Sequence, residues 1–185
     1  MRLYLSSYQL GDHPEVFTGM VRGPRRGWVI MNAFDGAHPE VRRLETERQM
    51  VNLEGIGLAA RELDLREHDA GSLSVKFGRP DFLWVRGGNV FMLRAALARS
   101  GADALIADRL RADELVYAGF SAGYASSPRA CGASKSVTQR RMPCPCMGSE
   151  ALTRVAAAYL QERRPFWALR DGQALVVNGN SVVHH

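Results

Sequence analysis

One short motif in the last third of the chain has the residue types and spacing of a nucleophilic serine turn. Its five residues are Gly119, Phe120, Ser121, Ala122 and Gly123, which match the pattern G-x-S-x-G. The motif directly follows an apolar run and precedes small residues that can start a helix. Its glycines permit a sharp turn that lifts the Ser121 hydroxyl above the strand ends, with the Ala122 amide facing the same space. This arrangement predicts acyl transfer through a covalent serine intermediate; the alternative is an ordinary serine in a turn of small residues.

A second glycine turn follows the apolar run at 81–86 (DFLWVR). It consists of Gly87, Gly88 and Asn89. Glycines there let backbone amides approach a bound carbonyl, so Gly88 and Ala122 are the candidate oxyanion donors. Asn89 is the candidate cap of a following helix and a candidate substrate-binding residue. The alternative is a plain turn with a helix cap.

Strands that alternate with helices must position these two turns. The expected helices cover 38–60, with Val41, Leu44 and Val51 as the buried stripe, then 90–100, 104–110 and 152–160. The expected strands cover 2–6, 27–33, 62–65, 81–86 and 115–119, and a hairpin at 174–183 turns around Asn178-Gly179. The pattern predicts an α/β fold, with a mostly parallel sheet, helices on both faces and a C-terminal β-hairpin.

Composition favours one compact soluble domain over residues 1–185: 46% of the residues are hydrophobic and 23% are charged. No apolar run is long enough to cross a bilayer, and no signal-peptide core opens the sequence, which favours a cytoplasmic protein without a membrane partner. The net charge of +5 resides in residues 125–170, which carry +6. No aromatic residues interleave the charges between 125 and 149, so nucleic acid is not an expected partner.

The segment 126–148 departs from this pattern. It has no helical or alternating period, no acidic residue, and all three cysteines of the chain, Cys131, Cys144 and Cys146. Three cysteines with this spacing and no nearby histidine do not match a structural zinc site. No metal and no other cofactor is therefore expected.

Four segments resemble the peptidase E family of serine peptidases, which includes aspartyl dipeptidases and the related cyanophycinases. They are LYLSSYQLG near the start, VRGGNVFMLRAAL, YAGFSAGY and ALRDGQALVV. The resemblance covers about residues 1–125 and 149–180. It implies a fold similar to class I glutamine amidotransferase domains, a flavodoxin-like three-layer sandwich. It also implies a nucleophile at Ser121, oxyanion donors at Gly88 and Ala122, and, at Asp171, the acid that orients the catalytic base. From the residues alone, Asp171 is equally a turn residue before a strand.

The sequence lacks one residue that the resemblance requires. In this family a histidine between the nucleophile and the late acid takes the serine proton, and this chain has no histidine between Ser121 and Asp171. Three hypotheses remain open. The segment 126–148 is a shifted reading frame or a deletion, which we favour and which sequencing of the locus tests. His13 or His38 substitutes as the base. Or the protein is a natural pseudoenzyme.

The predicted function is hydrolysis of short peptides after an N-terminal aspartate, through an acyl-enzyme on Ser121. The alternatives are another acyl-transfer or amidotransferase-like hydrolase, and a catalytically inactive binding or assembly module. A small peptide is the expected partner. A disrupted segment at 126–148 would also expose apolar surface and promote assembly into a homo-oligomer.

Overall fold

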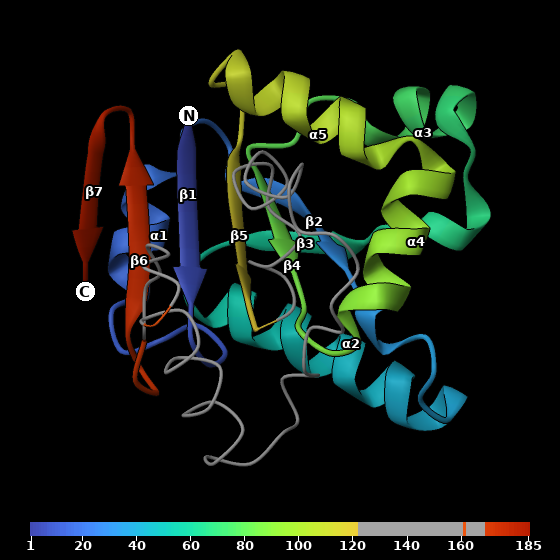
Figure 1. The fold of residues 1–185 in the computed structure, drawn as a ribbon, viewed down its shortest axis with the longest axis horizontal. Coiled ribbons are helices and arrows are strands. Elements are labelled where there is room, and N and C mark those ends of the chain that lie inside the picture. The colour runs from blue at the N-terminus through green and yellow to red at the C-terminus, as the bar shows by residue number, and fades with distance from the viewer. Residues whose placement is uncertain (122–160, 162–168) are drawn as a thin grey trace.

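A seven-stranded, mostly parallel sheet forms the centre of the protein (Figure 1). The computed structural model describes residues 1–121, 161 and 169–185. In spatial order the strands are β3 (Ala59–Glu62), β2 (Arg26–Ile30), β4 (Phe82–Val85), β5 (Val116–Phe120), β1 (Arg2–Ser6), β6 (Ala174–Asn178) and β7 (Ser181–His184). β3 to β1 run parallel, and β6 and β7 are antiparallel to their neighbours. β1, β4 and β5 are buried along their whole length, and β4 is apolar throughout, as is usual for a strand buried on both faces.

The strand register aligns the segments that carry the candidate site along one edge of the sheet. Phe120 ends β5 opposite Ser6 of β1, and Ser6 also pairs with Ala174, the first residue of β6. On the other side of β5, Val85 of β4 pairs with Gly119. The residues that follow β4 and β5, and those that precede β6, therefore share the carboxyl edge of the parallel strands, where open α/β sheets bind ligands.

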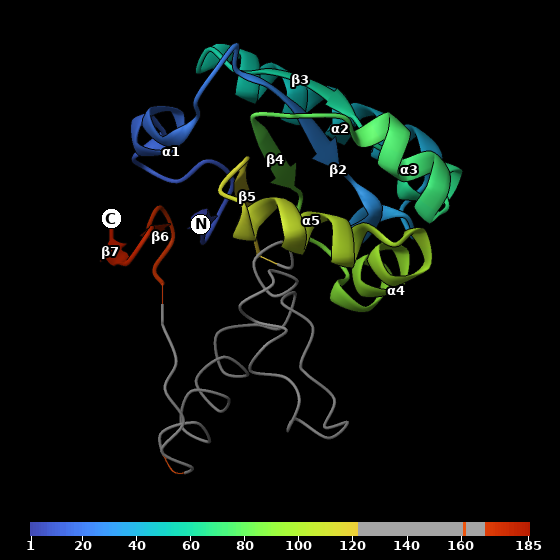
Figure 2. The same ribbon diagram turned by 90° about the horizontal axis from the view of Figure 1, so that it is seen from above.

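Helices cover both faces of the sheet (Figure 2). They are α1 (Pro14–Met20), α2 (Pro39–Gly55), α3 (Ala70–Phe77), α4 (Val90–Ser100) and α5 (Ala102–Arg111), with short 3₁₀ turns at Asn32–Phe34 and Leu65–Glu67. Side chains from α1 and α2 join one buried cluster with Trp84, and those from α3, α4 and α5 join a second cluster with Leu83. Trp84 and Leu83 are consecutive in β4, so their side chains point to opposite faces. The expected α/β sandwich is confirmed.

The expected strand at 27–33 ends early because Asn32 draws the chain into a turn. Asn32 is fully buried, and its side chain donates to Asp35 and Asp64 and accepts from the Leu65 amide at 3.1 Å. The next strand also lies earlier than expected, at Ala59–Glu62 rather than 62–65. Both shifts concern boundaries, and the order of the elements is unchanged.

The expected buried stripe of the helix at 38–60 is wrong. Val41, Leu44 and Val51 are 47%, 52% and 63% exposed, so this stripe faces outward from α2. The buried face of α2 is formed instead by Thr46, Gln49 and Leu53.

The sequence patterns do not predict α1 or α3. α1 is short and begins with Pro14 in its first turn, where the missing N–H of proline removes no hydrogen bond. α3 begins with a reciprocal capping box between Asp69 and Ser72.

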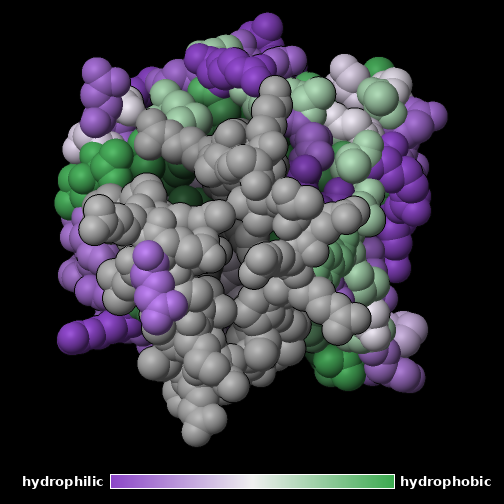
Figure 3. Space-filling model, in the orientation of Figure 1, coloured by the Kyte–Doolittle hydropathy of each residue, from purple (hydrophilic) through white to green (hydrophobic). Residues whose placement is uncertain are grey.

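The C-terminal hairpin forms as expected, but its turn is one residue later. Asn178 pairs with Ser181, which leaves Gly179 and Asn180 in the turn, and Gly179 has a φ of +60°. β7 is the outer strand, and its Val182 and Val183 are exposed; green surface appears over this edge in Figure 3. The expected helix at 152–160 lies outside the described residues. Within the described part of the chain, none of the helices combines the length and apolarity needed to span a bilayer.

Candidate active site

Ser121 adopts a backbone conformation that is rare for a residue with a side chain. Its φ is +53°, immediately after β5 ends at Phe120. Residues other than glycine adopt this left-handed region at a cost in energy, and such strain is concentrated at functional sites. A nucleophile in a G-x-S-x-G turn is expected at such a strained position, at the carboxyl edge of a sheet. Ala122, the predicted second oxyanion donor, lies outside the described residues.

Gly87 lies directly against Ser121. A Cβ atom built on Gly87 would be 2.6 Å from the Ser121 Cβ, 3.2 Å from its Oγ and 2.7 Å from the Phe120 carbonyl oxygen. The distances to the Ser121 Cβ and to the Phe120 oxygen are shorter than real Cβ contacts allow. The two predicted turns are therefore in contact, and only a glycine fits at residue 87.

Gly88 is held in a conformation that only glycine adopts without strain. Its φ is +149°, and a Cβ there would lie 2.5 Å from the Ala33 carbonyl oxygen. Among the described residues, no acceptor takes a hydrogen bond from the Gly88 amide. Asn89 caps α4, as expected: its side-chain oxygen accepts from the amides of Phe91 and Met92 at 3.0 and 3.2 Å.

Asp171 lies at the same sheet edge as Ser121, in the turn that precedes β6. Because β1 separates β5 from β6, the two turns are about 10 Å apart at ordinary strand spacing. Asp171 is exposed, and no described residue donates to its carboxylate. Together with Tyr8, Asp12 and Asn52 it lines a hollow of about 510 Å³. Tyr8 connects this hollow to the serine turn through an edge contact with Phe120, with the ring centroids 6.3 Å apart.

The two histidines considered as substitute bases both stand at helix starts. His13 precedes α1, and its Nδ1 lies 2.9 Å from the Glu15 carboxylate. His38 caps α2, where its Nδ1 accepts from the Glu40 amide at 3.3 Å. Within the described part of the chain neither ring contacts Ser121.

Sequence reasoning missed Arg86, which contacts both turns of the site. Its Nη1 donates to the Gly87 carbonyl at 2.5 Å, and its guanidinium lies 5.6 Å from the Phe120 ring centre. It also ion-pairs with Glu45 of α2 at 3.0 Å. The only sequence signal was an arginine at the end of an apolar strand.

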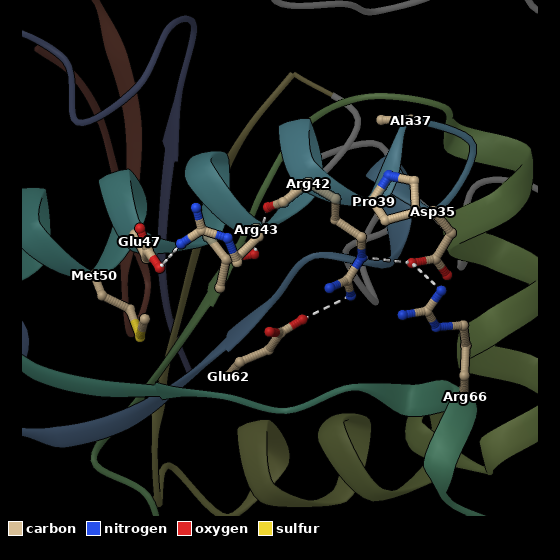
Figure 4. A pocket seen from close by; sticks show the side chains of 10 residues that line it. Asp35, Ala37, Pro39, Arg42, Arg43, Glu47, Met50, Glu62 and Arg66 are labelled. Atoms are coloured by element: carbon tan, nitrogen blue, oxygen red, sulfur yellow. Dashed lines mark hydrogen bonds and ion pairs between the residues drawn. The ribbon is translucent and has the colours of Figure 1, made fainter.

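A second hollow, of about 350 Å³, lies between α2 and β3 and is lined by charged groups that pair with one another (Figure 4). Arg42 contacts Asp35 at 3.1 Å and Glu62 at 2.6 Å, and Arg66 reaches Asp35 at 3.6 Å. Each arginine that lines this hollow has an anionic partner. The hollow therefore attracts a charged ligand less strongly than it would if these arginines were unpaired. Among the described residues, no group of three or more histidine, cysteine or acidic side chains could hold a metal ion. The three cysteines lie outside the described residues.

Asp64 anchors the same charged network. Burial alone would raise the pKa of its carboxyl, but hydrogen bonds from the Arg66 side chain and amide, and from Asn32, outweigh burial and hold this pKa well below its usual range. The folded state therefore prefers the ionised carboxylate more strongly than the unfolded chain does. This preference stabilises the fold above about pH 4, the ordinary pKa of an aspartate, and is lost as the pH falls through the lower pKa of the folded state.

We predict that Asp64→Asn lowers the free energy of unfolding at pH 7 by about 1–3 kcal/mol, and that the difference from the parent shrinks below about pH 4. Urea unfolding at pH 7, 5 and 3 measures it. The exposed Glu67→Gln removes the same charge nearby and serves as control. An Asp64→Asn deficit that is constant over this pH range would contradict the assignment.

Comparison with known proteins yields one family. The model of peptidase family S51 matches residues 43–184, more than three quarters of the chain. Over 71 residues the chain is 44% identical to the uncharacterized peptidase Lmo0363 of Listeria monocytogenes serovar 1/2a (strain ATCC BAA-679 / EGD-e). It is 41% identical, over the same length, to the uncharacterized peptidase Lin0382 of Listeria innocua serovar 6a (strain ATCC BAA-680 / CLIP 11262). Each alignment covers 38% of this chain and 34% of the relative, so the match spans about a third of the length of these curated relatives.

Two solved structures share the fold. One, from Listeria monocytogenes EGD-e, is described as a peptidase E protein; it superposes with a TM-score of 0.68 at 22% identity, over 100% of this chain and 97% of the other. The other is a peptidase from an acI-B1 Actinobacterium, with a TM-score of 0.55 at 16% identity, over 66% of this chain and 54% of the other. At these identities the likeness concerns the fold.

Proposed function

Since this chain belongs to peptidase family S51, the family that its motifs resemble, we propose that it is a serine-type peptidase whose nucleophile is Ser121. One observation carries the assignment. Among the described residues, Ser121 directly follows a central buried strand with a positive φ, at the carboxyl edge of the sheet, and it packs against a glycine that leaves no room for another side chain. Backbone strain of this kind is concentrated at functional sites.

The proposed reaction begins when the Ser121 Oγ attacks the carbonyl carbon of the peptide bond and its hydroxyl proton passes to solvent. The Gly88 amide, which has no acceptor among the described residues, donates to the developing oxyanion, and Ala122 is the proposed second donor. Collapse of the tetrahedral intermediate breaks the C–N bond and releases the amine, which takes a proton. Water then hydrolyses the acyl-enzyme by the reverse sequence.

The substrate proposed is a short peptide with an N-terminal aspartate. This preference comes from the resemblance to aspartyl dipeptidases. Asn89 is the proposed substrate-binding residue, because only its side-chain oxygen is used in capping α4 and its nitrogen is left to donate to a substrate. Asp171, at the same edge, is the proposed acidic member of the site.

No residue is assigned as the catalytic base in this mechanism. The sequence has no histidine between Ser121 and Asp171, and in the described part of the chain the rings of His13 and His38 are engaged by Glu15 and by the Glu40 amide. Loss of the base in serine peptidases costs about 10⁶ in kcat and leaves about 10³–10⁴ over the uncatalysed rate. We therefore expect slow turnover. The same observation favours, as the second candidate, a catalytically inactive module that binds peptides at this edge.

Hydrolysis of Asp-Leu by the purified protein, compared with Ser121→Ala, distinguishes the two candidates. We expect slow release of leucine that the variant abolishes. Equal, negligible rates in both proteins would contradict the peptidase; binding of Asp-Leu measured by calorimetry would then support the inactive module.

A further inference from the structure

Arg86 contacts four residues from different parts of the chain, next to the candidate site: Gly87, Glu45, Phe34 and Phe120. It is the first residue after β4, and its Nη1 donates to the carbonyl of the next residue, Gly87, at 2.5 Å. Its Nη2 donates to Glu45 of α2 at 3.0 Å. Its guanidinium lies 4.1 Å from the ring centre of Phe34 and 5.6 Å from that of Phe120. One planar cation therefore contacts the segments that follow β2 and β4, the last residue of β5, and α2.

Two of these contacts reach the nucleophile through a single intermediate. Gly87 packs against the Ser121 Cβ, with no room even for a methyl group. Phe120 precedes Ser121 in the chain. A movement of the Gly87 carbonyl or of the Phe120 ring would therefore displace the Ser121 hydroxyl, and it would also shift Gly88, the proposed oxyanion donor.

The surroundings of Arg86 fit a positioning role better than a role in stability alone. Arg86 is 15% exposed and Glu45 16% exposed, so the ion pair is largely removed from water. The Arg86 Nε is buried and has no acceptor among the described residues. A buried ion pair that leaves an N–H without an acceptor contributes little to the stability of a fold. The planar guanidinium, in contrast, can donate hydrogen bonds in two directions while its faces contact aromatic rings.

We propose that Arg86, held by Glu45, is a positioning residue that fixes Ser121 and Gly88 relative to each other through the Gly87 carbonyl and the Phe120 ring. The inference rests on the proposed function, because it concerns the reactivity of Ser121. Arg86 itself touches neither the reacting atoms nor the attacking hydroxyl. It acts on the geometry of attack.

The experiment measures the rate at which a fluorophosphonate modifies Ser121. In this reaction Oγ forms a bond to phosphorus, fluoride leaves, and the hydroxyl proton passes to solvent. We expect Arg86→Ala to lower the second-order rate constant by about 10–100-fold, the range for a misplacement near 1 Å. Guanidinium ion at tens of millimolar should restore part of the rate. Arg86→Lys should restore little, because an ammonium lacks the planar fork, and Glu45→Gln should have a smaller effect than Arg86→Ala.

Arg94→Ala is the matched control. Arg94 also pairs with a carboxylate of another helix, Asp103 of α5, at 2.9 Å, but it does not contact Gly87 or Phe120. Its loss should leave the labelling rate unchanged, with or without guanidinium. A rate for Arg86→Ala equal to that of the parent, or a loss that guanidinium does not reverse, would overturn the proposal.

A second readout separates this proposal from the proposed function. If the parent protein shows no labelling at Ser121, the peptidase assignment fails, and hydrogen–deuterium exchange then decides the positioning role. Arg86→Ala should speed exchange in the peptides that contain Gly87–Asn89 and Val116–Ser121, with no change in α3. Unchanged exchange around both turns, or an increase spread evenly over the chain, would overturn it.

Discussion

Gly87→Ala is expected to slow modification or acylation of Ser121 by about 100-fold or more. The added methyl would lie 2.6 Å from the Ser121 Cβ and 2.7 Å from the Phe120 carbonyl oxygen. The second of these is a backbone atom at the end of a central strand, so it cannot move aside as a flexible side chain would. The turn must shift instead, and a displacement near 1 Å at a reacting group costs about two orders of magnitude in rate. Fluorophosphonate labelling of the parent and the variant measures the effect.

Gly55→Ala is the control for this prediction. Gly55 is the last residue of α2, and a Cβ there would meet no atom within 4 Å. Its replacement should leave the labelling rate unchanged and affect stability little. A Gly87→Ala protein that labels as fast as Gly55→Ala would show that the two turns are not packed together.

Trp84→Ala is expected to lower the free energy of unfolding by about 3–5 kcal/mol, the usual cost of removing a buried large aromatic side chain. Trp84 is fully buried and contacts the rings of Phe17 and Phe120 at centroid distances of 5.8 and 5.9 Å. Its indole N–H donates to Gln49 at 3.0 Å. The substitution therefore leaves a cavity and also a buried amide without its donor. Since domains of this size are stable by about 5–15 kcal/mol, this one change removes a large share of the total.

Trp84→Phe separates the two contributions. It keeps most of the ring packing but removes the N–H, so we expect a loss of about 1–3 kcal/mol. Urea unfolding followed by far-ultraviolet circular dichroism measures both variants. Equal losses in Trp84→Phe and Trp84→Ala would show that the hydrogen bond, and not the packing, accounts for the contribution of Trp84.

The hydrogen bond between Trp84 and Gln49 explains why the apolar stripe of α2 does not mark its buried face. Val41, Leu44 and Val51 recur at helical spacing, and such a stripe usually marks the buried face. In this helix the buried face must supply an acceptor for the Trp84 indole, and Gln49 does so. Trp84 is 35 residues away in the chain, so no local pattern could reveal that demand.

The central strands and both site turns were predictable because their signals are local. β4 and β5 are short apolar runs and β1 is a short alternating run, each bounded by turn residues, and Ser121 and Gly88 lie in glycine turns that follow β5 and β4. Asn89 was predictable as a cap by its position before α4. The contact between Gly87 and Ser121 was not, since it depends on β4 and β5 being neighbours in the sheet.

Arg86 illustrates what sequence alone could not supply. Its partners Phe34, Glu45 and Phe120 come from three other elements, and no spacing relates them. An arginine after a buried strand carries no signal of its own, because most arginines are exposed. Only the arrangement of the sheet edge brings this guanidinium against the back of the serine turn.

The most direct test of the account is to identify the residue that a fluorophosphonate modifies, by intact mass and peptide mapping. We expect one adduct per chain, on Ser121, formed faster than on the other serines and absent from Ser121→Ala. The result that would contradict it is an unmodified parent protein, or an adduct that persists in Ser121→Ala.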